Sequence, residues 1–266
     1  MLQLIQQGAL ILGTTLGAIT DAKTGYIFDW ITYPMILIGF VLAIMQQQYN
    51  NLFGAGIIFA LLYITYKFGK LGGGDVKLFV GIALLNPYND YLFFASAMLS
   101  AAVSAMIFYS IFYTIKYAKM GIRFEENSKG IQKALLYGVI LLGYFSLLII
   151  MQLISYTSAT IILIPMLTGL LFIAFQKGIT KNFFEKKILL KEIEEEEVIA
   201  EEGNSEKILK LLSGKKLIGE TEKTLLLKNK IKSINVLRGL PPFGPFILVG
   251  ILVAIAQPQL FMFLFI

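Results

Sequence analysis

Residues 91–115 read YLFFASAMLSAAVSAMIFYSIFYTI, an uninterrupted run without a charged side chain. A helix needs about 20 apolar residues to cross a bilayer. Similar runs lie near residues 4–20, 28–46, 52–69, 76–88, 133–153, 156–176 and 244–264. The pattern predicts an all-α polytopic membrane protein with about eight membrane segments, or as few as about six. The run at 76–88 is short, and 133–176 can form either two spans or one long, bent interfacial segment.

The composition agrees with a membrane protein and excludes several kinds of site. Of the residues, 57% are hydrophobic and 15% are charged, and the mean hydropathy is +0.74; soluble domains carry roughly 25% charged residues. Cysteine and histidine are both absent. Their absence excludes disulfides, cysteine-rich zinc sites, Ser-His-Asp triads and histidine bases. We therefore expect acid–base chemistry from Asp, Glu, Lys or Tyr, with no cofactor and no metal.

The basic residues lie in alternating loops. They follow the first and third runs, separate the fifth from the sixth, and fill the segment before the last run, whereas the loops at 46–51, 86–90 and 152–158 contain none. The positive-inside rule then places the basic loops in the cytoplasm and both termini outside a cell membrane. This distribution explains the net charge of +6 without a nucleic-acid partner. Met1–Leu12 has no basic n-region, so we expect no cleavable signal peptide.

The composition divides the chain into three parts. Residues 1–176 are expected to form a membrane domain, 177–240 a cytoplasmic domain or loop, and 241–266 the last transmembrane helix. Within the middle part, the acidic stretch 185–206 is expected to be helical. Residues 209–212, 215–218 and 224–227 are expected to be short strands. This predicts a small α+β insertion; a solvated charged loop is the simpler alternative, and substrate docking on Glu194–Glu197 is the more specific one.

The aspartates are few, namely Asp21, Asp29, Asp75 and Asp90. Asp21 ends the first span and Asp75 begins the fourth, so the topology brings both carboxylates to the cytoplasmic face. Ionisable groups at such depths are costly unless they are paired or hydrated, which makes both functional candidates. Simpler roles are a loop ion pair for Asp21, helix caps for Asp29 and Asp75, and a solvated loop position for Asp90.

Three consecutive glycines, Gly72, Gly73 and Gly74, precede Asp75. Each glycine costs a helix about 1 kcal/mol relative to alanine. Such a cluster is expected where the backbone turns sharply or another chain approaches closely, as an extended peptide substrate would. A hinge or packing role is the alternative.

The motifs as a set resemble those of type IV prepilin peptidases, including the archaeal preflagellin peptidases. Gly72-Gly73-Gly74-Asp75-Val76-Lys77 resembles the GxGD signature of intramembrane aspartyl peptidases. The segment 21–29, DAKTGYIFD, is similar to the family's first-aspartate segment, with Phe28 in place of the usual Pro. Pro242-Phe243-Gly244-Pro245 resembles the stretch that introduces the family's last helix. All three occur in family order.

The resemblance implies a peptidase whose catalytic pair is Asp21 and Asp75. One ionised carboxylate activates water, and one protonated carboxylate polarises the scissile carbonyl and then protonates the leaving amine. Gly72, Gly73, Gly74, Lys77, Pro242, Phe243, Gly244 and Pro245 would bind substrate or support the site; for Lys77, an interfacial lysine is the simpler role. The implied partners are the lipid bilayer and archaellin or pilin precursors, cleaved behind a short basic leader. Without cysteine, the Cys-x-x-Cys domain and N-methylation activity of bacterial members are expected to be missing.

Three alternatives remain open at this point. An ion-coupled transporter or channel would use Asp21 and Asp75 as cation or proton sites. A non-catalytic membrane scaffold would tolerate their replacement by asparagine. A presenilin-type protease would place its first aspartate after Tyr in mid-span, whereas Thr20 precedes Asp21 here.

Overall fold

The computed structural model describes residues 1–68, 71–193, 197–200, 203–212, 215, 217–229, 231–260 and 262. Its membrane part consists of the helices α1 (Leu2–Thr24), α2 (Asp29–Met45), α3 (Tyr49–Lys67), α4 (Gly73–Leu84), α5 (Tyr91–Lys119), α6 (Phe124–Ile150), α7 (Tyr156–Ile179) and α10 (Gly244–Ala256). Each apolar run of the sequence overlaps one of these helices, although α10 ends at Ala256, before the end of the run at 244–264. The segment 133–176 lies on two of them, α6 and α7. The predicted fold class, a polytopic α-helical membrane protein, is confirmed.

Among the described residues, five helices are long and apolar enough to cross a membrane: α1, α3, α5, α6, and α7 together with its continuation to Phe184. The helices α2 and α10 are apolar but shorter. Pro34 lies inside α2 and Pro165 inside α7. Interior prolines are tolerated in membrane helices because neighbouring groups satisfy the freed backbone carbonyls.

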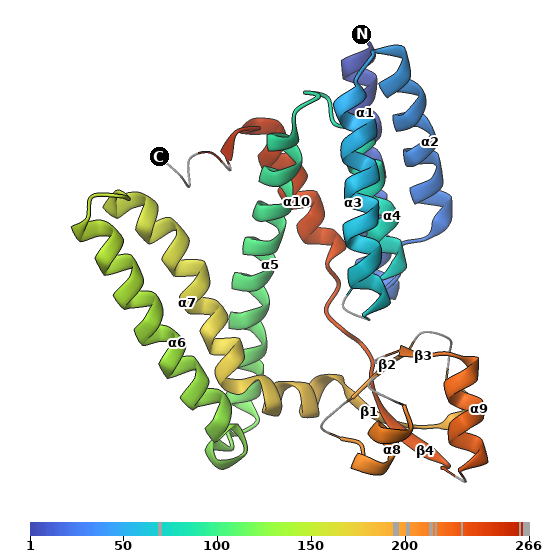
Figure 1. The fold of residues 1–266 in the computed structure, drawn as a ribbon, viewed down its shortest axis with the longest axis vertical. Coiled ribbons are helices and arrows are strands. Elements are labelled where there is room, and N and C mark those ends of the chain that lie inside the picture. The colour runs from blue at the N-terminus through green and yellow to red at the C-terminus, as the bar shows by residue number, and fades with distance from the viewer. Residues whose placement is uncertain are drawn as a thin grey trace.

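The helices α1–α4 form a bundle that α10 joins to α5 (Figure 1). Its core is a continuous apolar cluster from α1, α2, α4, α5 and α10, which includes Leu10, Ile31, Leu78, Phe93 and Ile251. The apolar residues that point outward from the helices are exposed, as expected where lipid is the solvent. Figure 1 shows that the C-terminal end of α1, the N-terminal end of α4 and the start of α10 lie at the same end of the bundle.

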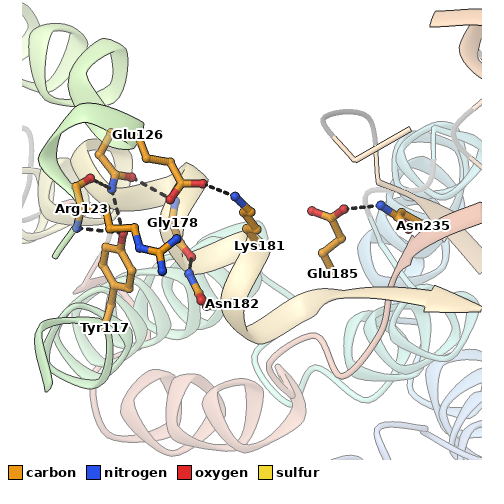
Figure 2. Close-up of polar contacts among 9 residues, drawn as sticks. Tyr117, Arg123, Glu126, Gly178, Lys181, Asn182, Glu185 and Asn235 are labelled. Atoms are coloured by element: carbon orange, nitrogen blue, oxygen red, sulfur yellow. Dashed lines mark hydrogen bonds and ion pairs between the residues drawn. The ribbon is translucent and has the colours of Figure 1, made fainter. Parts of the chain in front are cut away.

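Buried polar contacts attach α6 and α7 to the end of α5. Asn127, 1% exposed, donates from Nδ2 to the Tyr117 hydroxyl (3.0 Å) and to the Arg123 carbonyl (2.9 Å). Its Oδ1 accepts from the Gly178 amide at 3.0 Å. Figure 2 shows this junction beside the ion pair of Lys181 with Glu126, whose atoms lie 2.6 Å apart. Buried polar groups require such partners, so these bonds specify how the two helices are docked.

Residues between α7 and α10 form a small α+β unit. It begins with the π-helical turn η1 (Thr180–Phe184) and continues through β1 (Glu185–Leu189), η2 (Leu190–Glu192), β2 (Glu197–Ile199), α8 (Glu206–Leu211), β3 (Leu217–Ile218), α9 (Glu220–Lys228) and β4 (Ser233–Leu237). The strands pair antiparallel in the order β1-β4-β2-β3. Leu190, Ile218, Leu226, Ile234 and Val236 belong to a separate core for this unit.

Several local predictions for this unit are wrong. The acidic stretch 185–206, expected to be helical, contains β1 and β2, because pairing with β4 buries Ile188 and Ile199. Tertiary pairing here outweighs the helix propensity of the Glu and Lys residues. The expected strands at 209–212 and 224–227 lie mostly in α8 and α9 instead. Both helices have Glu in the first turn and Lys in the last, which suits the helix dipole. Of the expected strand 215–218, Leu217 and Ile218 form β3, Lys215 belongs to no strand, and residue 216 lies outside the described residues.

The acidic tetrad Glu194–Glu197 is only partly within the described residues, since 194–196 lie outside them. Glu197 lies in β2, where its side chain is 10% exposed and pairs with Arg238. It is therefore an internal ion-pair partner and not a freely exposed acidic side chain.

Candidate active site

Asp21 lies in the last turn of α1 and is 7% exposed. The helix ends three residues later, at Thr24, because Gly25 adopts a left-handed conformation (φ 74°) and its amide donates to the Asp21 carbonyl. Oδ2 of Asp21 accepts a 2.6 Å hydrogen bond from the Gly244 amide, which begins α10. The backbone amide of Phe243 also faces this carboxylate. Two segments at opposite ends of the sequence thus meet at one acidic side chain.

Asp75 is the third residue of α4 and is partly buried. Its Oδ2 accepts a 3.3 Å hydrogen bond from the Gly72 amide. This contact is the carboxylate half of a capping box, so the cap predicted as the simpler role for Asp75 is present. The cap does not exclude chemistry, because one hydrogen bond leaves further acceptor positions on the carboxylate.

The structure brings Asp21 and Asp75 together at the same end of the bundle. Their carboxylates lie close enough for the two charges to interact. Gly74 lies against the loop after α1: a Cβ there would lie 2.7 Å from the Ile27 carbonyl oxygen, a contact that real Cβ atoms do not make. In this structure the glycine cluster therefore allows close backbone approach between α4 and the loop after α1.

The segment 242–245 supplies the third side of the site. Pro242 and Phe243 precede α10, Gly244 begins it, and Pro245 stands in the first turn, where a missing N–H is harmless. A Cβ on Gly244 would lie 2.9 Å from Cβ of Asp21 and 3.2 Å from Cα of Ala18. Only glycine lets the α10 backbone reach the carboxylate. The ring of Phe243 packs beside Phe79 of α4, with centroids 6.3 Å apart.

Lys77 and Asp29 form an ion pair at the edge of the site, with Nζ and Oδ1 2.6 Å apart. Nζ also lies 5.0 Å from the centroid of the Tyr33 ring. Asp29 was expected to be a cap or structural residue at the start of α2. It stands in the first turn of this helix, whose N-cap is Phe28, and no side-chain cap bond forms. Lys77 thus ties the start of α4 to the start of α2. The pair is half-exposed, as is usual for an interfacial lysine.

Asp90 has a role other than the expected one, and Tyr109 makes a contact that the sequence does not predict. Asp90, expected to be a solvated loop residue, caps α5 through a 2.9 Å bond from the Leu92 amide. Tyr109 of α5 donates to the Pro242 carbonyl at 2.5 Å and lies near the Asp21 charge. No motif marks Tyr109, which is one of several aromatic residues near the end of α5. Within the described ranges, no cluster of three or more Asp or Glu is placed to bind a metal ion.

Comparison with known proteins finds a family resemblance for the first part of the chain. Residues 8–111 match the sequence model of the type IV leader peptidase family. The matched region includes Asp21 and Asp75 and ends before the segment 242–245. The resemblance to prepilin peptidases that the motifs indicated is therefore confirmed for this part of the chain.

A curated protein of this kind is similar over nearly the same length. Prepilin peptidase EppA of Methanothermobacter thermautotrophicus (strain ATCC 29096 / DSM 1053 / JCM 10044 / NBRC 100330 / Delta H) is 33% identical over 101 residues. The alignment covers 35% of this chain and 26% of the relative, so the match spans about a quarter of the relative's length. No solved structure matches the chain.

Proposed function

We propose that this protein is a membrane aspartyl endopeptidase that removes the short basic leader from archaellin or type IV pilin-like precursors. The observation that carries the proposal is the convergence of Asp21, Asp75 and Gly244 at one end of a membrane bundle. The family match over residues 8–111 supports the same class of reaction.

In the proposed mechanism, the two carboxylates hold one proton between them. Two like charges that interact are not both stable when partly buried, so one group stays ionised and the other protonated. The ionised group removes a proton from a water molecule, which attacks the scissile carbonyl carbon. The protonated group donates a hydrogen bond to the carbonyl oxygen and then gives its proton to the leaving amine as the C–N bond breaks. The pair then holds the proton removed from water, so it again carries one proton. Asp21 and Asp75 fill these roles as a pair, with neither role assigned to one residue.

The site would face the cytoplasm, with both termini outside the cell. The support is the distribution of basic residues in the sequence. The loops at this end of the bundle carry the Lys and Arg residues, and such loops usually lie in the cytoplasm. A precursor with a basic leader and an apolar helix would present its junction at that depth. Carboxylates at one end of the bundle suit cleavage at an interface better than they suit a transporter, whose ion sites lie near the midplane.

The test is cleavage of an archaellin or pilin precursor by the full chain in membranes. Wild type should remove the leader, whereas Asp21→Asn and Asp75→Asn should each lose activity by about 10³-fold or more. Asp90→Asn is the matched control, because the same chemical change is made at a residue that caps α5 away from the site; asparagine also caps helices, so full activity is expected. Cleavage that persists in either site variant would contradict the proposal.

A further inference from the structure

The short segment 238–243, here called the strap, connects β4 of the soluble unit to the start of α10. At its first residue, the Arg238 amide donates to the Phe184 carbonyl at 2.8 Å, and the guanidinium pairs with Glu197. Directly after its last residue, the Gly244 amide donates to Asp21. The strap thus runs from the sheet to the candidate catalytic carboxylate.

Near its membrane end, the strap accepts a hydrogen bond from α5. The hydroxyl of Tyr109 donates to the Pro242 carbonyl, a contact that joins positions 133 residues apart in the sequence. Pro242 has no backbone N–H to donate a hydrogen bond. Gly244 has no side chain that could hold this part of the chain in place. The Tyr109 hydroxyl is therefore the contact from α5 that fixes the peptide plane just before the Phe243–Gly244 amide.

The orientation of this hydroxyl is set by aromatic packing. The Tyr109 ring meets the Phe246 ring of α10 edge-on, with centroids 5.0 Å apart, and lies 5.8 Å from the Tyr113 ring. Edge-to-face contacts of this kind favour a defined ring position. Phe246 lies two residues after Gly244, so Tyr109 contacts the chain on both sides of the amide that bonds Asp21.

We propose that Tyr109 is a positioning residue for Asp21, which it orients through the Pro242 carbonyl and the Gly244 amide. The role rests on the proposed peptidase function, because Asp21 matters only if it takes part in cleavage. Tyr109 itself does not touch the substrate in this proposal. Its loss would let the strap move and would leave the Asp21 carboxylate in less well-defined positions.

The first test compares the kinetics of two matched variants. Tyr109→Phe keeps the ring and removes the hydroxyl, and we expect kcat to fall about tenfold with KM within about twofold, the effect of one lost hydrogen bond. Tyr113→Phe is the control, since it removes a neighbouring hydroxyl that makes no hydrogen bond to the strap in the described part of the chain. It should keep wild-type kcat. Equal kcat values for the two variants would overturn the proposal.

The second test measures the strap itself and needs no substrate. The chain contains no cysteine, so Leu240→Cys, at an exposed strap position, accepts a single spin label. The label should become more mobile in Tyr109→Phe and remain unchanged in Tyr113→Phe, with equal thermal stability in both. An unchanged label in Tyr109→Phe would contradict the positioning role. If wild type cleaved no precursor but the label responded, the peptidase proposal would fail while the structural link from Tyr109 to the strap stood.

Discussion

The amide of Gly244 donates a 2.6 Å hydrogen bond to Oδ2 of Asp21, across 223 positions of the sequence. The first and last apolar helices are therefore joined at one carboxylate. A backbone amide is a rigid donor, because the helix that begins at Gly244 sets its direction. The packing of α10 against α1 and α5 thus determines how the Asp21 carboxylate is oriented.

Replacement of Gly244 by alanine should separate these two groups. The added Cβ would lie 2.9 Å from Cβ of Asp21 and 3.0 Å from its Oδ2, so α10 must shift away. Displacement on the order of 1 Å at a reacting group reduces rates by about 100-fold. The measurement is precursor cleavage by the full chain. Gly143→Ala in α6, where a Cβ meets nothing within 4 Å, is the control and should retain activity; wild-type cleavage by Gly244→Ala would contradict this account.

Much of the membrane fold was predictable from the sequence because membrane helices are local. A long apolar run can satisfy its backbone only as a helix, so the runs at 91–115 and 156–176 fix α5 and α7 without knowledge of their neighbours. The ordered motifs around Asp21 and Asp75 also identified the candidate pair. The contact between Gly244 and Asp21 was not predictable from spacing, since it depends on how two distant helices pack.

Asn127→Ala should loosen the junction of α5, α6 and α7. The change leaves the buried Gly178 amide, the partly buried Arg123 carbonyl and the Tyr117 hydroxyl without their side-chain partner. An unsatisfied buried group costs about 1–3 kcal/mol, so the free energy of unfolding should fall by about 2 kcal/mol or more. Thermal unfolding of the purified protein measures it.

Lys181→Ala at the same junction provides the comparison. It removes an ion pair whose lysine is 58% exposed (Figure 2), and exposed pairs contribute at most about 1 kcal/mol. If Asn127→Ala were no less stable than Lys181→Ala, the buried bonds would not be what docks the two helices.

The ion pair of Lys77 with Asp29 should contribute little to stability. Both side chains are partly exposed, at 34% and 54%. A double-mutant cycle with Lys77→Met and Asp29→Asn should give a coupling free energy of at most about 1 kcal/mol. The coupling should weaken in about 1 M salt, because screening acts on exposed charges. A larger, salt-independent coupling would show that the pair is buried in the working protein.

Glu222 in α9 makes the soluble unit sensitive to acid. The pKa of Glu222 is lowered from 4.5 to about 2. The largest cause is the hydrogen bond from Lys215, and hydrogen bonds from Thr221 and the Gly219 amide add to it. A lowered pKa adds stability that is complete above the unfolded value and is lost as pH falls through the folded value. Hydrogen exchange of α9 in the full chain should therefore show protection that decreases between about pH 4.5 and 2.

Glu222→Gln is the control for this pH dependence. It should show weaker protection at neutral pH and a smaller change on acidification, because the group that titrates is gone. An identical pH profile in wild type and Glu222→Gln would mean that other carboxylates control the acid response.

The soluble unit shows where reasoning from the sequence fails. Residues 185–206 are rich in Glu and Lys, which favour helix, yet β1 pairs with β4 in a register that joins Glu185 to Leu237. That pairing brings together residues far apart in the sequence, and no local pattern reports it. Likewise, Tyr109 belongs to an aromatic stretch of α5 in which nothing distinguishes the one hydroxyl that reaches the strap.

The most direct test of the central claim is whether Asp21 and Asp75 act as one unit in precursor cleavage. Rates are measured in membranes for wild type, Asp21→Asn, Asp75→Asn and the double variant. The effects of substituting residues that act together are strongly non-additive. Each single variant should therefore lose about 10³-fold or more of the cleavage rate, and the double variant should be no slower than the less active single variant. A single variant that still cleaves, or losses that multiply in the double variant, would contradict a shared site.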